Sequence, residues 1–393
     1  MAITGIIVAG IISFWYKKPP TVKVGLIFSL SGIMSNSEKP LKDAALFAIR
    51  EINQAGGLQG HQIEPVIADS KSDWVHAASE AERLITEEKV VALFACWTST
   101  CRKSVKRIVE KHKHLLFYPL QYEGLEQSED IFYTGAAPNQ QIIPALAWGM
   151  KNFGSRIFLV GSDYIFPKTA NLIIKETAFA LGASIVGERY LPLDSNAVSS
   201  IVEEIKKLQP DFVINTINGK TNLAFFRALQ ETGLSAMDVP IISSSIAEGD
   251  FIGNPGLTAG HYVVWSYFQS IDTLRNQQFI RDFKKFTDPG HLINDPMESV
   301  YISIQLWANA VRDANTFNPD RVKRALLRQS LDAPQGIVSV DPFTHHLWRT
   351  IRIGKSRGDG NYEIAWSSEF PIRPSPFPEL HNREEWFQLI TDK

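Results

Sequence analysis

Aromatic, amide and carboxylate side chains that directly follow a short apolar run form the most informative stretch of the chain. Residues 115–117 read as a buried strand, and Tyr118–Gly124, with the sequence YPLQYEG, comes next, followed further on by Tyr133–Gln141. Side chains of these types line pockets for small polar ligands. In open parallel sheets, ligands sit beyond the carboxyl ends of the strands. The stretch therefore predicts where this protein binds a ligand.

Motifs for enzyme chemistry are absent from the sequence. It has no GxGxxG after its first strand and no GxxxxGK[ST], so neither a dinucleotide nor a phosphate-cradling loop is indicated. It has no GxSxG nucleophile elbow and no HExxH, and the pairs His112/His114 and His345/His346 lack the spacing of metal ligands. We predict no catalytic residues, no metal site and no cofactor, and an enzyme on this fold is the least favoured alternative.

Length and charge narrow the class of protein further. A chain of 393 residues is too long for one ordinary core and indicates about two domains. The formal net charge of -2 gives no electrostatic case for a nucleic acid partner, which requires a concentrated basic face.

The two cysteines, Cys96 and Cys101, do not match a zinc pattern. An exported protein permits a disulfide between them, but their spacing does not demand one. Two buried or half-buried thiols are the favoured interpretation.

The first twenty residues differ from the rest. Residues 2–16 are nearly all apolar and precede Lys17-Lys18-Pro19-Pro20. This run is shorter than the roughly 20 residues that span a bilayer and fits a signal-peptide core or signal anchor, although no basic residue precedes it and no clear cleavage site follows. We expect export to the periplasm or another extracytoplasmic location, with membrane attachment through residues 2–16 as an alternative.

Strand and helix patterns alternate along most of the chain, which predicts parallel sheets with helices on both faces. The expected strands of the first half are 22–28, 63–69, 89–95 and 115–118, with helices at 40–53, 76–87 and 102–112. The expected strands of the second half are 156–161, 184–190, 211–216 and 239–243, with helices at 144–153, 169–181, 199–208 and 222–232. Helices at 297–314 and 319–329 follow, then strands at 336–340 and 351–353, and an extended proline-rich segment at 370–378.

This organisation predicts two open α/β lobes joined by several crossings. We expect a first lobe of residues 21–138 plus about 267–335 and a second of 139–266 plus about 336–370, between an N-terminal segment 1–20 and a C-terminal tail 371–393. Strand-end loops of both lobes would line the cleft: 29–31, 69–74, 97–99, 118–123, 162–167, 215–218 and 243–248.

Several motifs in sequence order resemble the urea-binding proteins of ABC transporters and the related receptors for short aliphatic amides. They are Trp97-Thr98-Ser99 with Arg102-Lys103, Tyr118–Gly124, Tyr133–Gln141, Gly161–Pro167, Asp332–Gly336 and Trp366–Ser368. The resemblance covers about residues 22–378. It implies the type I periplasmic binding protein fold, in agreement with the two lobes read from the alternation.

The resemblance also implies ligand-facing residues, namely Trp97, Thr98, Ser99, Tyr118, Gln121 and Tyr164. Trp97 and Gln121 match the urea branch better than the amide branch, because Gln121 adds a donor and an acceptor where an acyl chain would lie. Glu248, on a second-lobe loop, is expected either to contact the ligand or to bridge the lobes.

Each candidate has a structural alternative. Trp97 would otherwise pack between a helix and a strand, Ser99 would cap a helix, and Tyr118 and Tyr164 would act as hinge or lobe contacts. We expect Pro138, Asn139 and Asp163 at the hinge or in lobe contacts rather than on the solute.

The resemblance implies a protein that closes on urea, or a similar small neutral amide, and delivers it to an ABC permease and ATPase. The alternative is a ligand sensor coupled to a kinase or a cytoplasmic regulator. Three features depart from the transporter branch: Lys39-Pro40 in a first-lobe loop, Lys220 in a second-lobe loop, and the tail 381–386.

Overall fold

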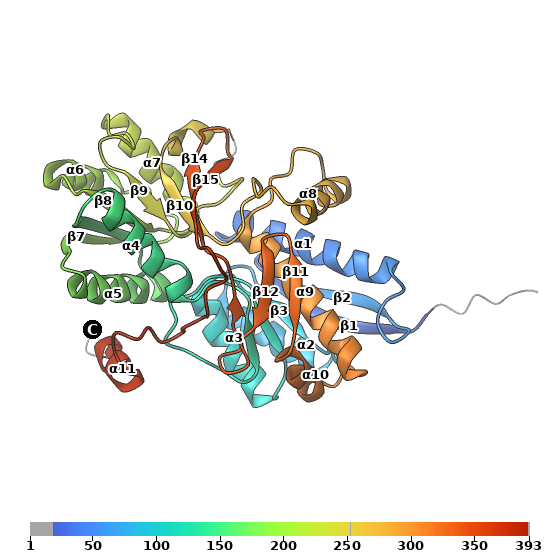
Figure 1. Ribbon diagram of the computed structural model, residues 1–393. Helices are drawn as coiled ribbons and strands as arrows, with labels where there is room; N and C mark the ends of the chain where they lie inside the picture. Colours follow the sequence, from blue (N-terminus) through green and yellow to red (C-terminus); the bar gives the residue numbers. More distant parts are fainter. Residues whose placement is uncertain (1–18, 252, 392–393) are drawn as a thin grey trace, which may run out of the picture.

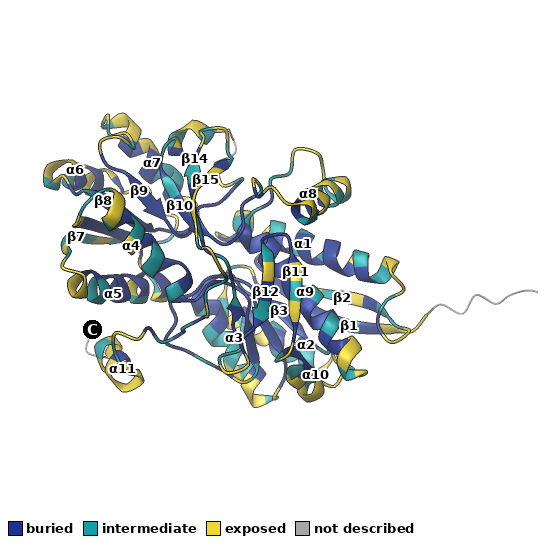
Figure 2. Ribbon diagram, in the orientation of Figure 1, coloured by how far each residue is buried: buried dark blue, intermediate teal, exposed yellow. Residues whose placement is uncertain are grey.

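Two α/β lobes lie side by side and are joined by three crossings of the chain (Figure 1). The computed structural model describes residues 19–251 and 253–391. This architecture confirms the predicted fold class. Buried residues follow the two sheets and the helices that cover them, and exposed residues lie on the outer helix faces (Figure 2).

The first lobe contains a five-stranded parallel sheet in the order β2-β1-β3-β4-β5. Its strands are β1 (Thr21–Phe28), β2 (Gln62–Asp69), β3 (Leu93–Ala95), β4 (Leu116–Tyr118) and β5 (Ile131–Tyr133). Its helices are α1 (Ser35–Gln54), α2 (Trp74–Thr86), α3 (Ser99–Lys111), α8 (Leu274–Phe286), α9 (Asp295–Ala314) and α10 (Pro319–Leu326). Helix α1 packs against α9, and α2 packs against α3.

Local capping explains where these helices begin. Asp73 accepts hydrogen bonds from the backbone N–H groups of Val75 and His76 at 2.9 Å each, and Thr98 accepts one from the N–H of Cys101 at 3.2 Å. Helix α1 starts at Ser35, more than one turn before its predicted start. The buried carboxylate of Glu38 accepts hydrogen bonds from Ser29 N (2.8 Å) and Oγ (2.9 Å), which fixes that first turn to the end of β1.

The second lobe contains a seven-stranded sheet in the order β15-β14-β10-β9-β8-β6-β7. Its strands are β6 (Arg156–Ser162), β7 (Ser184–Leu191), β8 (Phe212–Thr216), β9 (Ile241–Ser243), β10 (Tyr262–Trp265), β14 (Arg352–Ser356) and β15 (Tyr362–Ser367). Its helices are α4 (Ile142–Asn152), α5 (Ile165–Ala180), α6 (Ser199–Leu208) and α7 (Thr221–Glu231). Strands β14 and β15 are antiparallel, and the others are parallel.

A third, smaller sheet holds β11 (Ser330–Ala333), β12 (Gly336–Val340) and β13 (Leu347–Trp348). Strand β11 packs on α8 and α9, and the backbone N–H of Tyr133 in β5 donates to the carbonyl of His345 at 2.9 Å. The predicted strand 336–340 is therefore present as β12, but it lies beside the first lobe. The chain then returns to the second lobe, where β14 and β15 form part of the seven-stranded sheet. The complete set of lobe boundaries stays a prediction.

The C-terminal tail ends in a helix that the sequence patterns did not predict. Helix α11 (Arg383–Thr391) lies below α5 in Figure 1, and Trp386 is buried in the apolar cluster of the second lobe. The segment before it contains no long helix or strand, as expected from its prolines.

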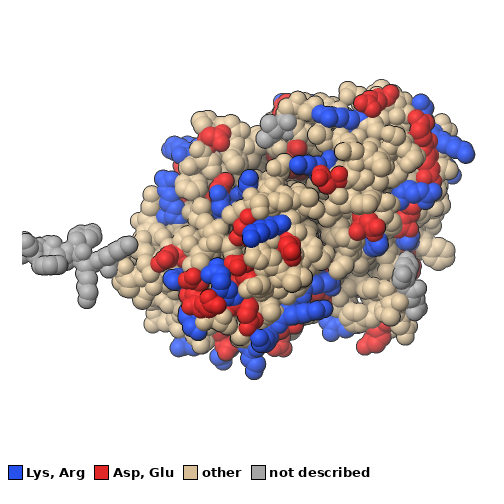
Figure 3. All heavy atoms as spheres, turned by 180° about the vertical axis from the view of Figure 1, so that it is seen from behind, with Lys and Arg blue, Asp and Glu red and all other residues tan. Residues whose placement is uncertain are grey.

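Surface charge is mixed on the face opposite to that of Figure 1. Lysine and arginine side chains are interspersed with aspartate and glutamate there (Figure 3). None of the helices in 19–251 and 253–391 has the length and hydropathy needed to cross a bilayer. The predicted membrane-attachment segment, residues 2–16, lies outside the described residues.

Candidate ligand site between the lobes

Strand-end loops of the two lobes touch through direct hydrogen bonds. The indole Nε1 of Trp97, after β3, donates to Oδ1 of Asn218, after β8, at 3.3 Å. The amide Nε2 of Gln121, after β4, donates to the carbonyl of Ser244, after β9, at 3.1 Å. The carboxyl ends of both sheets therefore meet at one interface, where the parallel topology predicts a ligand.

A cavity of about 240 Å³ lies at this interface. Trp97 and the first turns of α1 line one side, and the loop that carries Glu248 lines another. The start of α9, with Asn294 and Met297, closes it further. A larger hollow of about 480 Å³ lies on the outer surface of the first lobe among Leu46, Ile49 and Pro65, and it contains none of the predicted site residues.

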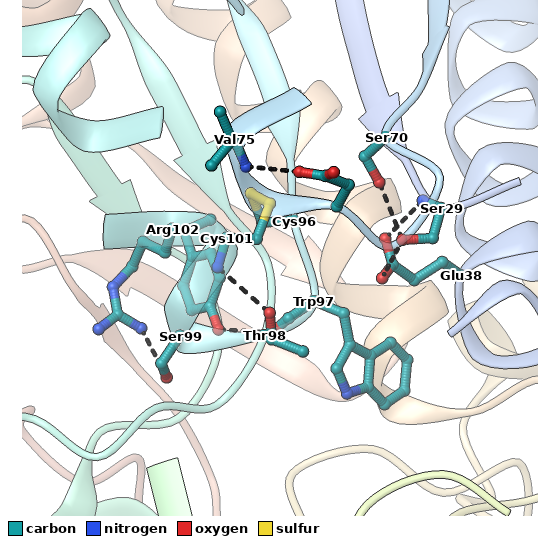
Figure 4. The surroundings of a disulfide bond; sticks show 12 residues. Ser29, Glu38, Ser70, Val75, Cys96, Trp97, Thr98, Ser99, Cys101 and Arg102 are labelled. Carbon is teal, nitrogen blue, oxygen red and sulfur yellow. Dashed lines mark hydrogen bonds between the residues drawn. A yellow bond between two sulfur atoms is a disulfide. The ribbon is translucent and has the colours of Figure 1, made fainter. Parts of the chain in front are cut away.

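The loop that carries Trp97 is closed by a disulfide. Cys96 and Cys101 are bonded, with their Cα atoms 5.6 Å apart, and both are buried (Figure 4). The expectation of two thiols was wrong. Cys96 has a left-handed backbone with φ of 73°, and this turn brings the end of β3 back toward the first turn of α3. The two cysteines are therefore close enough to bond, although their spacing in the sequence does not indicate a disulfide.

A buried ionic cluster lies behind this loop. Arg102 Nη2 donates to Glu123 Oε1 and Arg102 Nε donates to Glu126 Oε1, each at 2.9 Å. Burial opposes the charge on Arg102, but the two carboxylates raise its pKa well above the usual value. Burial alone would raise the pKa of Glu126, yet Arg102 and two nearby lysines hold it well below its ordinary range. The guanidinium is thus committed to the protein and is not free for an anionic ligand.

Predicted residues Thr98 and Ser99 are committed to local structure. Thr98 caps α3, and the Ser99 hydroxyl donates to Glu123 Oε2 and accepts from Arg102 Nη1, the latter at 3.1 Å. Thr98 therefore supplies the helix cap that was the structural alternative for Ser99, and Ser99 instead contacts the buried ionic cluster. Arg102 and Glu123 form the wall behind the site. A signal for them was present in the sequence, because an arginine near the start of one helix and a glutamate after a strand are opposite charges that can pair when buried.

Tyr118, Gln121 and Tyr164 gather around the same cluster. Tyr118 donates its hydroxyl to the Trp97 carbonyl at 2.7 Å, and its ring faces the Arg102 guanidinium at 4.9 Å. Burial raises the pKa of Tyr164 well above its ordinary value, with further contributions from the neighbouring Tyr118 and Glu123 on the other lobe. Tyr164 directly precedes α5, a helix that packs against α3 of the first lobe.

Two buried side-chain oxygens at the interface lack partners among the described residues: Gln121 Oε1 and Glu248 Oε2. The other carboxylate oxygen of Glu248 accepts from the N–H of Gln269 at 2.9 Å. Burial raises the pKa of Glu248 to about 8. The hydroxyls of Thr221, the first residue of α7, and of Ser245, after β9, are also buried without partners among the described residues.

The predicted hinge residues have distinct contacts. Pro138 and Asn139 start the 3-10 helix η1 (Pro138–Gln140) in the first crossing, and the Asn139 side chain bonds the backbone of Arg373 (2.8 Å) and Ser375 (2.7 Å) in the tail. Asp163 is exposed and pairs with Lys168 of α5 at 2.5 Å. Asp163 therefore holds its own loop through Lys168, and its role at the hinge or in lobe contacts stays a prediction.

Two contact residues, Asn218 and Ser244, were not singled out as site residues, although their loops were expected to line the cleft. Neither has a motif of its own, because an asparagine and a backbone carbonyl gain their role only when the opposite lobe is in place. Trp97 and Glu248, by contrast, were predicted as site residues, and both line the cavity of about 240 Å³. Their roles toward a ligand stay predictions.

Comparisons with known proteins agree with this geometry. A family model described as periplasmic binding protein domain matches residues 22–383. The chain is 23% identical over 346 residues to Leu/Ile/Val-binding protein homolog 4 of Brucella melitensis, which covers 82% of this chain and 81% of that protein. The solute-binding protein of an ABC transporter from R. palustris, solved in complex with 4-hydroxybenzoate, is similar in fold, with a TM-score of 0.80, 22% identity, and coverage of 90% of this chain and 98% of that one.

A shorter match reaches limonene hydroxylase of Geobacillus stearothermophilus, at 35% identity over 118 residues. It covers 30% of this chain and spans 22% of the length of that protein, so it does not represent the two-lobed molecule. The match to the family model covers nearly all the described residues. The chain belongs to the periplasmic binding protein family, whose members are non-enzymatic, extracytoplasmic proteins that bind small solutes for ABC transporters.

Proposed function

We propose that this protein captures urea, or a similarly small neutral amide, between its lobes and delivers it to an ABC permease and ATPase. The observation that carries the proposal is the unpartnered buried oxygen Glu248 Oε2 of a cavity-lining residue, together with unpartnered Gln121 Oε1, whose amide nitrogen already bonds the opposite lobe. The hydroxyls of Thr221 and Ser245 in the second lobe are also buried without partners among the described residues. Urea offers NH2 donors to such acceptors and a carbonyl to such hydroxyls. An unmade buried hydrogen bond costs about 1–3 kcal/mol, so a solute that completes this set is strongly favoured.

The charge of the cavity supports a neutral solute over a carboxylate. Glu248, Asp250 and Asp288 are among its lining residues, and none of the described lining residues is a lysine or an arginine. The nearby Arg102 is already paired with two carboxylates. A benzoate, or the carboxylate of an amino acid, would therefore find no lysine or arginine in this cavity as a counter-charge.

Size supports the same class of ligand. Pockets for drug-sized molecules usually measure about 300–1,000 Å³, and this cavity measures about 240 Å³. Trp97 supplies a flat wall for a planar solute. Contacts from both lobes give the ligand the differential affinity for the closed state that drives closure.

Isothermal calorimetry with urea, formamide, acetamide, leucine and 4-hydroxybenzoate tests the proposal. We expect heat of binding from urea and weaker or no binding of leucine and 4-hydroxybenzoate. Gln121→Leu should weaken urea binding by about 1–3 kcal/mol, whereas Gln277→Leu, an exposed position on α8, should leave the affinity unchanged. Tight binding of leucine or 4-hydroxybenzoate, together with no response to any amide, would overturn the proposed ligand.

A further inference from the structure

The disulfide encloses Trp97, whose side chain reaches across the interface. Cys96 follows β3 directly and Cys101 lies in the first turn of α3, so the bond closes a short loop that contains Trp97, Thr98 and Ser99. Figure 4 shows the disulfide on one side of this loop and the Trp97 side chain pointing away from it. The bond therefore joins the two ends of a segment that also lines the cavity.

The backbone of this loop is in a conformation that needs support. Cys96 has φ of 73°, in the left-handed region that residues with a Cβ adopt at a cost in free energy. Two hydrogen bonds oppose relaxation: Cys96 N donates to Ile27 O at 3.1 Å, and Cys101 N donates to Thr98 Oγ1 at 3.2 Å. The covalent bond adds a third constraint, and it acts at the strained residue itself.

The position of Trp97 depends on that conformation. Its indole Nε1 reaches Asn218 of the second lobe, and its carbonyl accepts the Tyr118 hydroxyl at 2.7 Å. A relaxed Cys96 would rotate the following residue away from both partners, because the chain direction at a left-handed residue differs from that at an extended or helical one.

We propose that the Cys96–Cys101 disulfide is a positioning element for the ligand site, which holds Trp97 in its interlobe orientation before the solute arrives. This inference rests on the proposed ligand site between the lobes. A loop that is already ordered in the free protein loses little conformational entropy on binding. Loss of the disulfide should therefore weaken ligand affinity as well as protein stability. If the disulfide only stabilised the fold, its removal would lower the stability of the protein and leave ligand affinity unchanged.

The test compares the oxidised protein with the Cys96→Ser/Cys101→Ser double variant and with protein reduced by dithiothreitol. In the reduction, the dithiol gives two electrons and two protons to the sulfurs, which become thiols, and is itself oxidised to its cyclic disulfide. Val109→Ala is the matched control, because Val109 is buried at the far end of the same helix. It should lower the melting temperature and leave affinity unchanged.

We expect urea affinity to fall about tenfold in the double variant and in the reduced protein, and reoxidation should restore it. Amide hydrogen exchange of residues 97–101 should also accelerate, with the rest of the first-lobe sheet unchanged. Unaltered affinity and unaltered exchange of this loop, with only a lower melting temperature, would overturn the inference. If the oxidised protein binds no urea at all, the proposed function fails, and the exchange measurement still decides the role of the disulfide.

Discussion

Arg349 and Asp295 form a buried ion pair at the point where all three crossings between the lobes meet. Arg349 Nη2 lies 3.0 Å from Asp295 Oδ2, and Arg349 Nη1 donates to the carbonyl of Thr134 in the first crossing at 2.8 Å. Asp295 Oδ2 also accepts from the backbone N–H groups of Ser266 (3.0 Å) and Tyr267 (2.8 Å) in the second crossing. Arg349 itself stands in the third. One charged pair thus ties together the segments about which the lobes would move.

Arg349→Met should destabilise the protein by about 3–5 kcal/mol, because it leaves Asp295 buried without its charge partner. Arg357→Met is the matched control, since Arg357 pairs with Asp359 at 3.5 Å on the surface and both side chains are about half exposed. That substitution should cost less than about 1 kcal/mol. Unfolding should be followed in guanidinium chloride, because urea is the proposed ligand. Equal losses for the two variants would contradict the role of the Arg349–Asp295 pair.

The Trp97–Asn218 hydrogen bond should contribute to closure. Trp97→Phe keeps an aromatic wall and removes the indole N–H, and Asn218→Ala removes its acceptor. In a double-mutant cycle on urea affinity, we expect a coupling energy of about 0.5–1.5 kcal/mol. Trp348→Phe is a control, because Trp348 donates to Asp341 at 3.2 Å within its own part of the fold. Additive effects of Trp97→Phe and Asn218→Ala would show that the bond does not contribute to binding.

The raised pKa of Glu248 predicts a pH dependence of stability. Burial raises this pKa from 4.5 to about 8, so the folded state keeps a proton that the unfolded state loses. The free energy of unfolding should therefore fall as pH rises between 4.5 and 8. Glu248→Gln should reduce this slope by up to one proton, measured by denaturation at several pH values. Glu298, whose pKa is also raised by burial to about 8, should retain part of the slope. An unchanged slope would contradict the assignment.

Binding should be coupled to the same carboxyl group. NH2 donors of the solute favour the ionised form of Glu248, so binding near pH 7 should release protons and affinity should rise with pH up to about pH 8. Calorimetry in buffers of different ionisation enthalpy measures the number released, and Glu248→Gln should abolish the release. Proton uptake on binding would show that the solute instead accepts a hydrogen bond from the protonated acid.

Trp386 should hold the C-terminal helix on the second lobe. Its side chain is fully buried and its Nε1 donates to Pro378 O at 2.8 Å, whereas the neighbouring Phe387 is 46% exposed. Trp386→Ala should weaken docking of the tail by about 3–5 kcal/mol. Trypsin should then cleave after the exposed Arg383 much faster, as followed by mass spectrometry. Phe387→Ala, the matched control, should change this rate little, and equal rates in both variants would contradict the anchoring role.

The sequence alone determined the layered α/β architecture, and it predicted the edge of the sheets at which a ligand would bind. Apolar runs such as 22–28 and 212–216 alternate with helical patterns, and these periods are local properties of the chain. Parallel strands place their carboxyl ends on one edge, so the loops that carry Trp97, Gln121 and Glu248 were expected there. The choice of Trp97 and Gln121 within those loops came from the family resemblance. Patterns failed for short or late elements, such as β5, β10 and α11, which are too brief or too polar to show a clear period.

Only the tertiary structure decided which distant groups meet. The disulfide depends on one left-handed residue, Cys96, and no spacing rule signals that turn. Strand β12 joins a separate sheet, although its sequence fits either lobe. Trp97 meets Asn218 across 121 residues of chain, and Arg349 meets Asp295 across 54. These pairings follow from the packing of whole lobes and from the need to satisfy buried polar groups, and neither condition leaves a local mark in the sequence.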